Sequence, residues 1–199
     1  MSTVDNERNV QINKLLQIDD KVRALLSRKL TEYAICHFAN LSPYSLSFGK
    51  EQYGKPKLLS HPKLFFSVSH CDSWIVCAVD EKPIGLDIEK IENFDSDTLE
   101  FFCSTSECET IKASEWPELQ YYKYWTIKES MLKLVGAGLF ANPRKVIVCP
   151  LNNSVIKVNF ENKDWMGESI VTDDGYVLSA VNTSNISKAI LVSPDVFYE

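Results

Sequence analysis

The sequence predicts an α+β fold built from two lobes of similar size, residues 1–93 and 94–199. Two observations predict it. Helical periodicity is followed by short β-type runs in each half, so the order along the chain is helix, sheet, helices, sheet. The 199 residues are 45% hydrophobic, which suffices for one core or for two small lobes that share an interface. No segment between the halves is long or polar enough to let them move as independent domains.

The first half begins with a helical pattern and continues with strands. Residues 10–38 carry apolar side chains at three- and four-residue steps, which is the period of an amphipathic helix. Residues 41–62 are interrupted by prolines and glycines, so we expect a loop with at most short strands. Three β-type runs follow, at 65–69, 74–79 and 84–88, with turn-forming residues between them. We expect these runs to form an antiparallel meander.

The second half repeats this order with more helix. Residues 98–102 and 104–111 are predicted to form short helices, and the second has a Ser-Thr pair at its start that can cap it. A longer helix is expected from Pro117 to the Gly-Ala-Gly break that follows it. Residues 145–192 are again rich in β-type runs.

Composition excludes several classes of function. A net charge of -6 lacks the basic surplus that attracts nucleic acid or anionic lipid. The six cysteines contain no C-x-x-C pair, and the three histidines are too scattered for a Cys/His zinc site. The first residues show no signal-peptide layout, and no run approaches a membrane span. We therefore expect a soluble cytoplasmic monomer that binds neither nucleic acid nor membrane.

Two acidic residues stand in one predicted strand, in the stretch IGLDIEKIE. Asp87 and Glu89 are two positions apart, so both side chains leave the same face of a strand. Two carboxylates on one face repel each other, and a divalent cation removes that repulsion. Oxygen ligands with no Cys or His nearby favour Mg²⁺ over zinc. The alternative is a strand edge on which both acids face water while Leu86 and Ile88 face the core.

The long predicted helix contains the stretch YYKYWTIKESMLKLVGAGL. Trp125 and Glu129 fall on one helical face, and Glu129 stands four residues before Lys133. The alternative is a purely structural role, because Glu and Lys at this spacing form an ordinary surface pair that stabilises a helix by about 0.2 to 0.5 kcal/mol. Lys128 is then a solvated charge and Trp125 a core residue.

Two further stretches offer ligand-binding groups in loops or turns. In FSVSHCDSW, Ser69 and His70 end a strand and begin a turn whose free N–H groups can hold a phosphate. Ordinary turn chemistry explains the same residues. In YGKP, Gly54 lets the backbone bend and Lys55 projects a positive charge from a loop.

Taken together, these stretches resemble one family. The order G-K-P, F-x-x-S-H, G-[LI]-D-[IV]-E and W-x-x-K-E-[SA]-x-x-K, with these separations, is similar to the phosphopantetheinyl transferases of the surfactin-synthetase-activating type. The resemblance extends over most of the chain. It implies two pseudo-symmetric α+β lobes with the 4′-phosphopantetheinyl transferase fold and with coenzyme A bound between the lobes.

The resemblance also implies an activity, the transfer of the 4′-phosphopantetheine arm of coenzyme A to a serine of an apo carrier protein. By motif match, Asp87, Glu89 and Glu129 bind Mg²⁺, with Mn²⁺ as the alternative metal. Lys133 stabilises or protonates the leaving phosphate, and the base is Glu129, Glu107 or a water molecule. Water as the nucleophile would instead make the protein a Mg²⁺-dependent pyrophosphate hydrolase, and a third alternative is an inactive coenzyme A-binding module.

Coenzyme A and the carrier are the expected partners. The residues matched to coenzyme A binding are Arg8, Arg23, Lys55, Ser69, His70, Lys128 and Lys133. Gln11 departs from the family pattern, since a lysine is expected near that position. The carrier is an acyl carrier, a peptidyl carrier or an aminoadipate reductase carrier domain, and the sequence does not choose among them. Three aromatic residues could face that partner or belong to the core: Phe101, Phe102 and Trp116.

Overall fold

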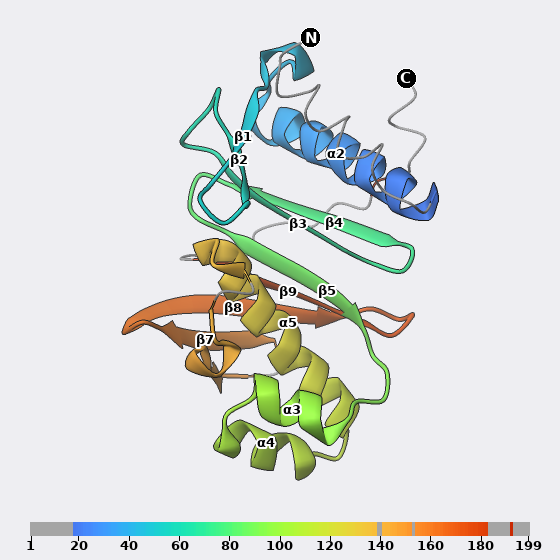
Figure 1. Ribbon diagram of the computed structural model, residues 1–199, viewed down its shortest axis with the longest axis vertical. Coiled ribbons are helices and arrows are strands. Elements are labelled where there is room, and N and C mark those ends of the chain that lie inside the picture. Colours follow the sequence, from blue (N-terminus) through green and yellow to red (C-terminus); the bar gives the residue numbers. More distant parts are fainter. Residues whose placement is uncertain (1–17, 139–140, 153, 183–191, 193–199) are drawn as a thin grey trace.

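A computed structural model describes residues 18–138, 141–152, 154–182 and 192, and its layers are visible in Figure 1. The first part comprises α2 (Ile18–Ala39), η1 (Pro43–Ser45), β1 (Phe48–Lys50), β2 (Pro56–Leu58), β3 (Phe65–Cys71) and β4 (Trp74–Asp80). The helix packs on the β3–β4 pair, and a small core of Ile35, Phe48, Leu58 and Phe66 lies beneath it. One or two helices are expected over 10–38, and the structure shows a single helix, α2, from residue 18 onward. Residues 10–17 lie outside the described residues.

Local sequence chemistry explains these elements. Asp19 and Asp20 stand in the first turn of α2, where carboxylates oppose the positive end of the helix dipole. Between α2 and β3, the chain forms the short helix η1 and the short strands β1 and β2, as the prolines and glycines there indicate. Strands β3 and β4 pair in antiparallel register from Phe65↔Asp80 to Cys71↔Trp74. Their two-residue turn contains Asp72 at a φ of 48°, a conformation that Asp tolerates better than most residues.

The third expected strand of the meander pairs elsewhere. Strand β5 (Gly85–Lys90) forms its backbone ladder with β9 (Tyr176–Asn182), so the prediction that it continues the meander after β4 is wrong. Its residues 85–88 are all buried, which suits a strand with neighbours on both sides rather than a hairpin edge. On the side away from β9, β5 lies beside β3, where the Leu86 N–H donates to the Ser67 hydroxyl at 3.0 Å.

The second part supplies helices and the larger sheet. Its elements are α3 (Ser96–Phe102), α4 (Thr105–Lys112), α5 (Pro117–Val135), η3 (Pro143–Lys145), β6 (Ile147–Pro150), β7 (Val155–Phe160), β8 (Lys163–Val171) and β9. The antiparallel sheet has the order β5-β9-β8-β7-β6. The α+β class with antiparallel sheets is therefore confirmed. The boundary between residues 93 and 94 stays a prediction. Of the β-rich stretch expected over 145–192, residues 183–191 lie outside the described residues.

Helix α5 is the element on which the larger core is built. Pro117 occupies its first turn, and Gly136 ends it in the left-handed conformation with a φ of 72°, as the sequence indicates. It lies across β5 and β9, visible as the yellow helix over the sheet in Figure 1. Its buried face carries Ile127 and Met131 into a core with Val158 and Val181. Within the described part of the chain, none of the helices is both long and apolar enough to span a bilayer.

Candidate active site between β3, β5 and α5

The β5 strand presents three alternate positions to α5. Gly85, Asp87 and Glu89 share one face because side chains alternate along a strand. At Gly85 the helix backbone comes so close that an added Cβ would lie 1.8 Å from the carbonyl oxygen of Ser130. The glycine thus lets α5 lie directly on β5. The two acids that follow it are thereby brought under the C-terminal half of the helix.

Asp87 and Lys133 form the centre of the site. The Lys133 ammonium lies 2.6 Å from Asp87 Oδ1, and the Asp87 side chain is only 4% exposed. Ser69 Oγ donates to the same carboxylate oxygen at 2.8 Å and accepts a hydrogen bond from Lys133 at 2.7 Å. Strand β3, strand β5 and helix α5 are therefore joined by one triangle of polar contacts. The sequence alternative of a water-facing strand edge does not describe Asp87.

The second oxygen of Asp87 has no partner. Among the described residues, Asp87 Oδ2 is one of three buried side-chain polar atoms that lack a hydrogen bond. A buried carboxylate oxygen without a partner is costly, since it has lost its water and gained nothing in return. Burial raises the pKa of Asp87, and Lys133, Ser69 and the backbone N–H of Ile88 act against this rise. The oxygen has an unused capacity to accept a cation or a proton.

Two more carboxyl groups, those of Glu89 and Glu129, feel the negative charge of Asp87. Burial, followed by the charge of Asp87, raises the pKa of Glu89 to about 7. The same two causes raise the pKa of Glu129, and Lys133 opposes them. The three acids predicted from the sequence thus lie close enough to repel one another. Among the residues that the structure describes, however, no set of three or more His, Cys, Asp and Glu side chains is arranged to hold a metal ion.

A cysteine lies beside these acids, contrary to the sequence-based expectation of a site without nearby Cys or His. The Cys71 thiol at the end of β3 hydrogen-bonds to Glu89 and lowers the pKa of that carboxyl, against the larger effect of burial. Burial itself raises the pKa of the Cys71 thiol to about 11. Cys71 is therefore a neutral hydrogen-bond donor to Glu89 rather than a thiolate.

Arg23 and His70 border the same region. Burial lowers the pKa of His70, and the charges of Arg23 and Lys133 lower it further, while Asp20 opposes them. Arg23 on α2 also makes a 3.3 Å ion pair with Asp20. The structure thus brings Arg23, His70 and Lys133 into one electrostatic neighbourhood, which suits a polyanionic ligand. Arg8 lies outside the described residues.

Lys55 is tied to the end of α5. Its ammonium donates to the carbonyl oxygen of Leu134 at 2.7 Å, where the last carbonyls of a helix carry partial negative charge. Burial lowers the pKa of Lys55, and the nearby Glu51 raises it. Lys55 thus contacts Leu134, the residue that directly follows Lys133 on α5. The structure brings these two lysines to the same end of α5.

Glu107 and Lys128 lie in a separate buried ion pair. The Lys128 ammonium is 2.7 Å from Glu107 Oε2 and also donates to the carbonyls of Pro143 and Val146, at 3.2 and 2.8 Å. The side chains are 0% and 7% exposed. Glu107 also completes the capping box of α4 with Ser104. All three ammonium hydrogens are used inside the protein, so this pair acts in the fold and presents nothing to a ligand in this conformation.

Comparison with known proteins assigns the sequence to a family. The sequence model of the 4′-phosphopantetheinyl transferase superfamily matches residues 83–181, and that of the N-terminal region of 4′-phosphopantetheinyl transferases matches residues 1–82. The chain belongs to the 4′-phosphopantetheinyl transferase superfamily. The two models meet just before β5, and they cover the site residues on both sides of that point.

Several proteins named as phosphopantetheinyl transferases are similar to this chain in sequence. A 4′-phosphopantetheinyl transferase of Bacillus subtilis is 37% identical over 142 residues, which are 70% of this chain and 63% of that protein. The transferase Sfp of B. subtilis strain 168 is 32% identical, with the same two coverages of 70% and 63%. The L-aminoadipate-semialdehyde dehydrogenase-phosphopantetheinyl transferase of mouse is 26% identical over 94% of this chain and 70% of its own length. The chain thus spans about 63% of the length of the two Bacillus relatives.

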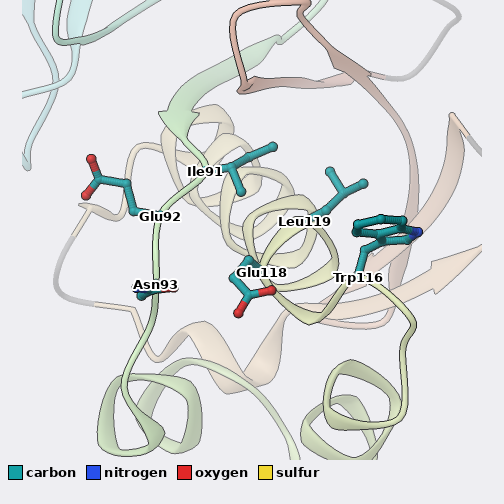
Figure 2. A pocket seen from close by; sticks show the side chains of 6 residues that line it. All are labelled: Ile91, Glu92, Asn93, Trp116, Glu118 and Leu119. Atoms are coloured by element: carbon teal, nitrogen blue, oxygen red, sulfur yellow. The ribbon is translucent and has the colours of Figure 1, made fainter.

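This superfamily member also has a hollow beyond the end of β5. Figure 2 shows its six lining residues, which come from the chain segment after β5 and from the start of α5: Ile91, Glu92, Asn93, Trp116, Glu118 and Leu119. Its volume is about 820 Å³. Trp116 and Phe101 are 65% and 70% exposed, while Phe102 is 4% exposed in the core. Of the three aromatic residues in question, only Phe102 is a core residue.

Sequence reasoning missed two residues of the site. Gly85 is part of the quoted G-[LI]-D-[IV]-E motif, and a glycine inside a strand is a known signal of close backbone approach. That signal could have identified it. Cys71 had no comparable signal, because its contact with Glu89 depends on β3 lying beside β5.

Proposed function

We propose that this protein transfers the 4′-phosphopantetheine arm of coenzyme A to a serine of an apo carrier protein. One observation carries the proposal. Asp87 is a buried carboxylate that contacts Lys133 through one oxygen and has no partner for the other, with Glu89 and Glu129 beside it. Acids and a lysine in this arrangement suit a pyrophosphate ligand and its metal ion. The relatives named as transferases support the same activity.

Asp87, Glu89 and Glu129 would hold Mg²⁺ or Mn²⁺. The residues fit such an ion, because Asp87 Oδ2 lacks a hydrogen-bond partner and all three acids are carboxylates whose pKa values are raised, first by burial and, for Glu89 and Glu129, also by the charge of Asp87. Carboxylate oxygens are the ligands that Mg²⁺ prefers. When bound, the ion supplies neutralisation of the pyrophosphate oxygens and aligns the reacting groups.

The residues of the chain would supply the remaining chemistry. The carrier serine oxygen forms a bond to the β-phosphorus of coenzyme A while the bond to the bridging oxygen breaks, and adenosine 3′,5′-bisphosphate leaves with that oxygen. The serine proton passes to Glu129, whose pKa is raised by burial and by Asp87. Lys133 neutralises the charge that grows on the leaving phosphate. Glu107 is a poorer base than Glu129, because its carboxylate is taken up by Lys128 and by backbone N–H groups.

Coenzyme A would lie along the β3 side of this site. Ser69 and Lys133 contact Asp87 directly, and Arg23 and His70 add positive charge or hydrogen bonds around it. This set can meet the nucleotide phosphates while leaving the three acids for the metal. We place Lys128 outside the coenzyme A site because its ammonium is fully used in the core.

The carrier would approach from the open side of the hollow in Figure 2. Trp116 and Phe101 are exposed near the start of α5 and on α3, and such side chains suit the apolar contacts of a protein partner. The named mouse relative makes an aminoadipate-semialdehyde dehydrogenase carrier one candidate, beside acyl and peptidyl carriers. We further propose that the protein acts as a cytoplasmic monomer.

A mass-shift assay tests the proposal. Purified protein is incubated with coenzyme A, Mg²⁺ and a panel of apo carriers (acyl, peptidyl and aminoadipate-semialdehyde dehydrogenase carriers). The mass of each carrier is then measured by mass spectrometry. The expected result is a mass gain of one phosphopantetheine arm on at least one carrier, with release of adenosine 3′,5′-bisphosphate. Free phosphopantetheine with no gain on any carrier would instead indicate a hydrolase. Coenzyme A binding with no reaction would indicate an inactive binding module.

A further inference from the structure

The turn between β3 and β4 is tied to the larger sheet by side chains. Asp72 in this turn accepts a hydrogen bond from the Tyr176 hydroxyl at 3.1 Å, and its carboxylate lies 3.3 Å from the Lys90 ammonium. Tyr176 also interacts with the neighbouring Ser73. Lys90 and Tyr176 are direct partners in the β5–β9 ladder. One aspartate thus contacts the ends of two strands in another sheet.

Further contacts join the same two sheets. The Trp74 indole N–H donates to Asp174 Oδ2 at 2.9 Å, and the Trp74 ring meets the Tyr176 ring edge-on with centroids 6.3 Å apart. At the far end of β4, the Asn182 amide donates to Asp80 Oδ2 at 2.6 Å. Strand β4 is therefore fastened to both ends of β9, although no backbone ladder between them is present among the described residues.

These contacts lie next to the candidate active site. Asp72 directly follows His70 and Cys71 on β3, and Lys90 directly follows Glu89 on β5. His70, on the proposed coenzyme A side, is two residues before Asp72 in the chain. Glu89, on the proposed metal side, is next to Lys90, which contacts Asp72. A small shift of the turn would move His70 and Cys71 relative to Glu89.

We propose that Tyr176 is a positioning residue for the transfer reaction: through Asp72, its hydroxyl holds the end of β3 at a fixed distance from Glu89. This inference rests on the proposed function. The Tyr176 residue is 5% exposed, so a phenylalanine would fill the same space, and the hydroxyl is the part that reaches Asp72. A substrate bound by both strands reacts at full rate only if the strands keep their separation.

Because the ion pair is exposed, we infer that these contacts fix the position of the turn rather than stabilise the fold. The Lys90 and Asp72 side chains are 44% and 52% exposed, and exposed pairs contribute little to folding. The hydrogen bond from Tyr176 to Asp72 is itself only partly buried. Its loss should therefore leave the fold intact and loosen the turn.

The test compares Tyr176→Phe with a matched control on the same sheet. Asp164 likewise pairs with a lysine, Lys157 at 2.8 Å, and accepts a hydrogen bond from Asn159 at 2.8 Å, but it lies on β8 in the β7–β8 hairpin. Asn159→Ala thus removes a hydrogen bond of the same kind at a place with no role in the proposed reaction. Asp72→Asn serves as the conservative variant, because Asn tolerates a positive φ and keeps an acceptor for the tyrosine.

Three readouts are measured: kcat and KM for coenzyme A with an apo carrier, the melting temperature, and hydrogen exchange of the amides of residues 70–74. For Tyr176→Phe we expect kcat to fall by about tenfold, as a small misplacement of reacting groups would cause. We expect faster exchange in the turn and a melting temperature no lower than that of Asn159→Ala. Asp72→Asn should keep a kcat within about twofold of the wild type, since it retains the contact.

Either of two kinetic results would overturn the inference. One is a wild-type kcat in Tyr176→Phe, and the other is an equal fall in Asn159→Ala. Failure of the proposed function is distinguished by hydrogen exchange, which needs no turnover. If the wild type modifies no carrier, exchange at residues 70–74 still tests the contact, and unchanged exchange in Tyr176→Phe rejects it.

Discussion

Lys133 and Asp87 form a contact of 2.6 Å between α5 and β5, with the aspartate buried and the lysine 31% exposed. Lys133 is therefore the cation that balances Asp87 in the absence of a ligand. A pyrophosphate and its metal ion would compete for both partners of this pair. The stability of the site therefore depends on whether the pyrophosphate and its metal ion are bound.

Lys133→Met should lower kcat by about 10²-fold or more, because it removes a preorganised cation from the leaving phosphate. It also leaves Asp87 without its charge partner, so the melting temperature without Mg²⁺ should fall. Because the lysine is 31% exposed, we expect a loss smaller than the about 3–5 kcal/mol typical of fully buried pairs. Addition of Mg²⁺ should raise the melting temperature more in the variant than in the wild type. An unchanged kcat would remove Lys133 from the reaction.

Glu129→Gln should bind coenzyme A but transfer its arm slowly, since it weakens the metal site and removes the proposed base. A fall in kcat of about 10²-fold or more is expected. Binding is measured by calorimetry and transfer by the carrier mass gain. Glu109→Gln, on the exposed face of α4, is the control and should behave as wild type. Wild-type turnover in Glu129→Gln would exclude Glu129 as base.

Stabilisation by Mg²⁺ should increase as the pH rises through about 7, where Glu89 titrates. The folded-state pKa of Glu89 lies above its ordinary value, so below pH 7 protons occupy the carboxylate that the metal needs. Without metal, ionised Glu89 opposes folding, and this cost is present above pH 7 and absent below the unfolded pKa. Melting temperatures with and without Mg²⁺ at pH 6 and pH 8 measure the effect. Equal stabilisation at both would contradict the role of Glu89 as a ligand.

Gly85→Ala should destabilise the protein by about 1–3 kcal/mol or more, because the new Cβ would lie 1.8 Å from the Ser130 carbonyl oxygen. The helix would have to move away from β5, which also separates Asp87 from Lys133. Urea unfolding measures the stability change. Gly49→Ala in β1 is the matched control, since the atoms nearest to its Cβ would be those of the flexible Leu59 side chain, at 3.0 Å. Equal effects at both glycines would contradict the close approach.

Lys128→Met should cost about 3–5 kcal/mol of stability, as expected when one partner of a fully buried pair is removed. Adding Glu107→Gln should recover part of this loss, because the orphaned charge disappears while the α4 capping contact remains. Calorimetry should show that any folded Lys128 variant binds coenzyme A with unchanged affinity. Weaker binding with wild-type stability would instead assign Lys128 to the ligand.

The sequence predicted the elements well where local chemistry determines them. The bounds of α5 follow from Pro117 and Gly136, and the paired strands β3 and β4 follow from the two β-type runs at 65–69 and 74–79. The turn expected over residues 70–73 is shorter in the structure, because His70 and Cys71 still pair with β4. The sequence-based prediction failed for the partner of β5. Pairing between strands about 90 positions apart leaves no local pattern, so proximity along the chain favoured the meander.

The same division holds for the site. By itself, the sequence determined that Asp87 and Glu89 share a strand face, that Glu129 and Lys133 share a helix face, and that their motifs match one family. Which charges meet depends on contacts between elements far apart in the chain. The tertiary structure buried Lys128 with Glu107 and brought Lys133 to Asp87, although Lys128 and Lys133 stand in the same motif. The physical reason is that residues five apart on a helix face different surroundings, and the surroundings come from distant parts of the chain.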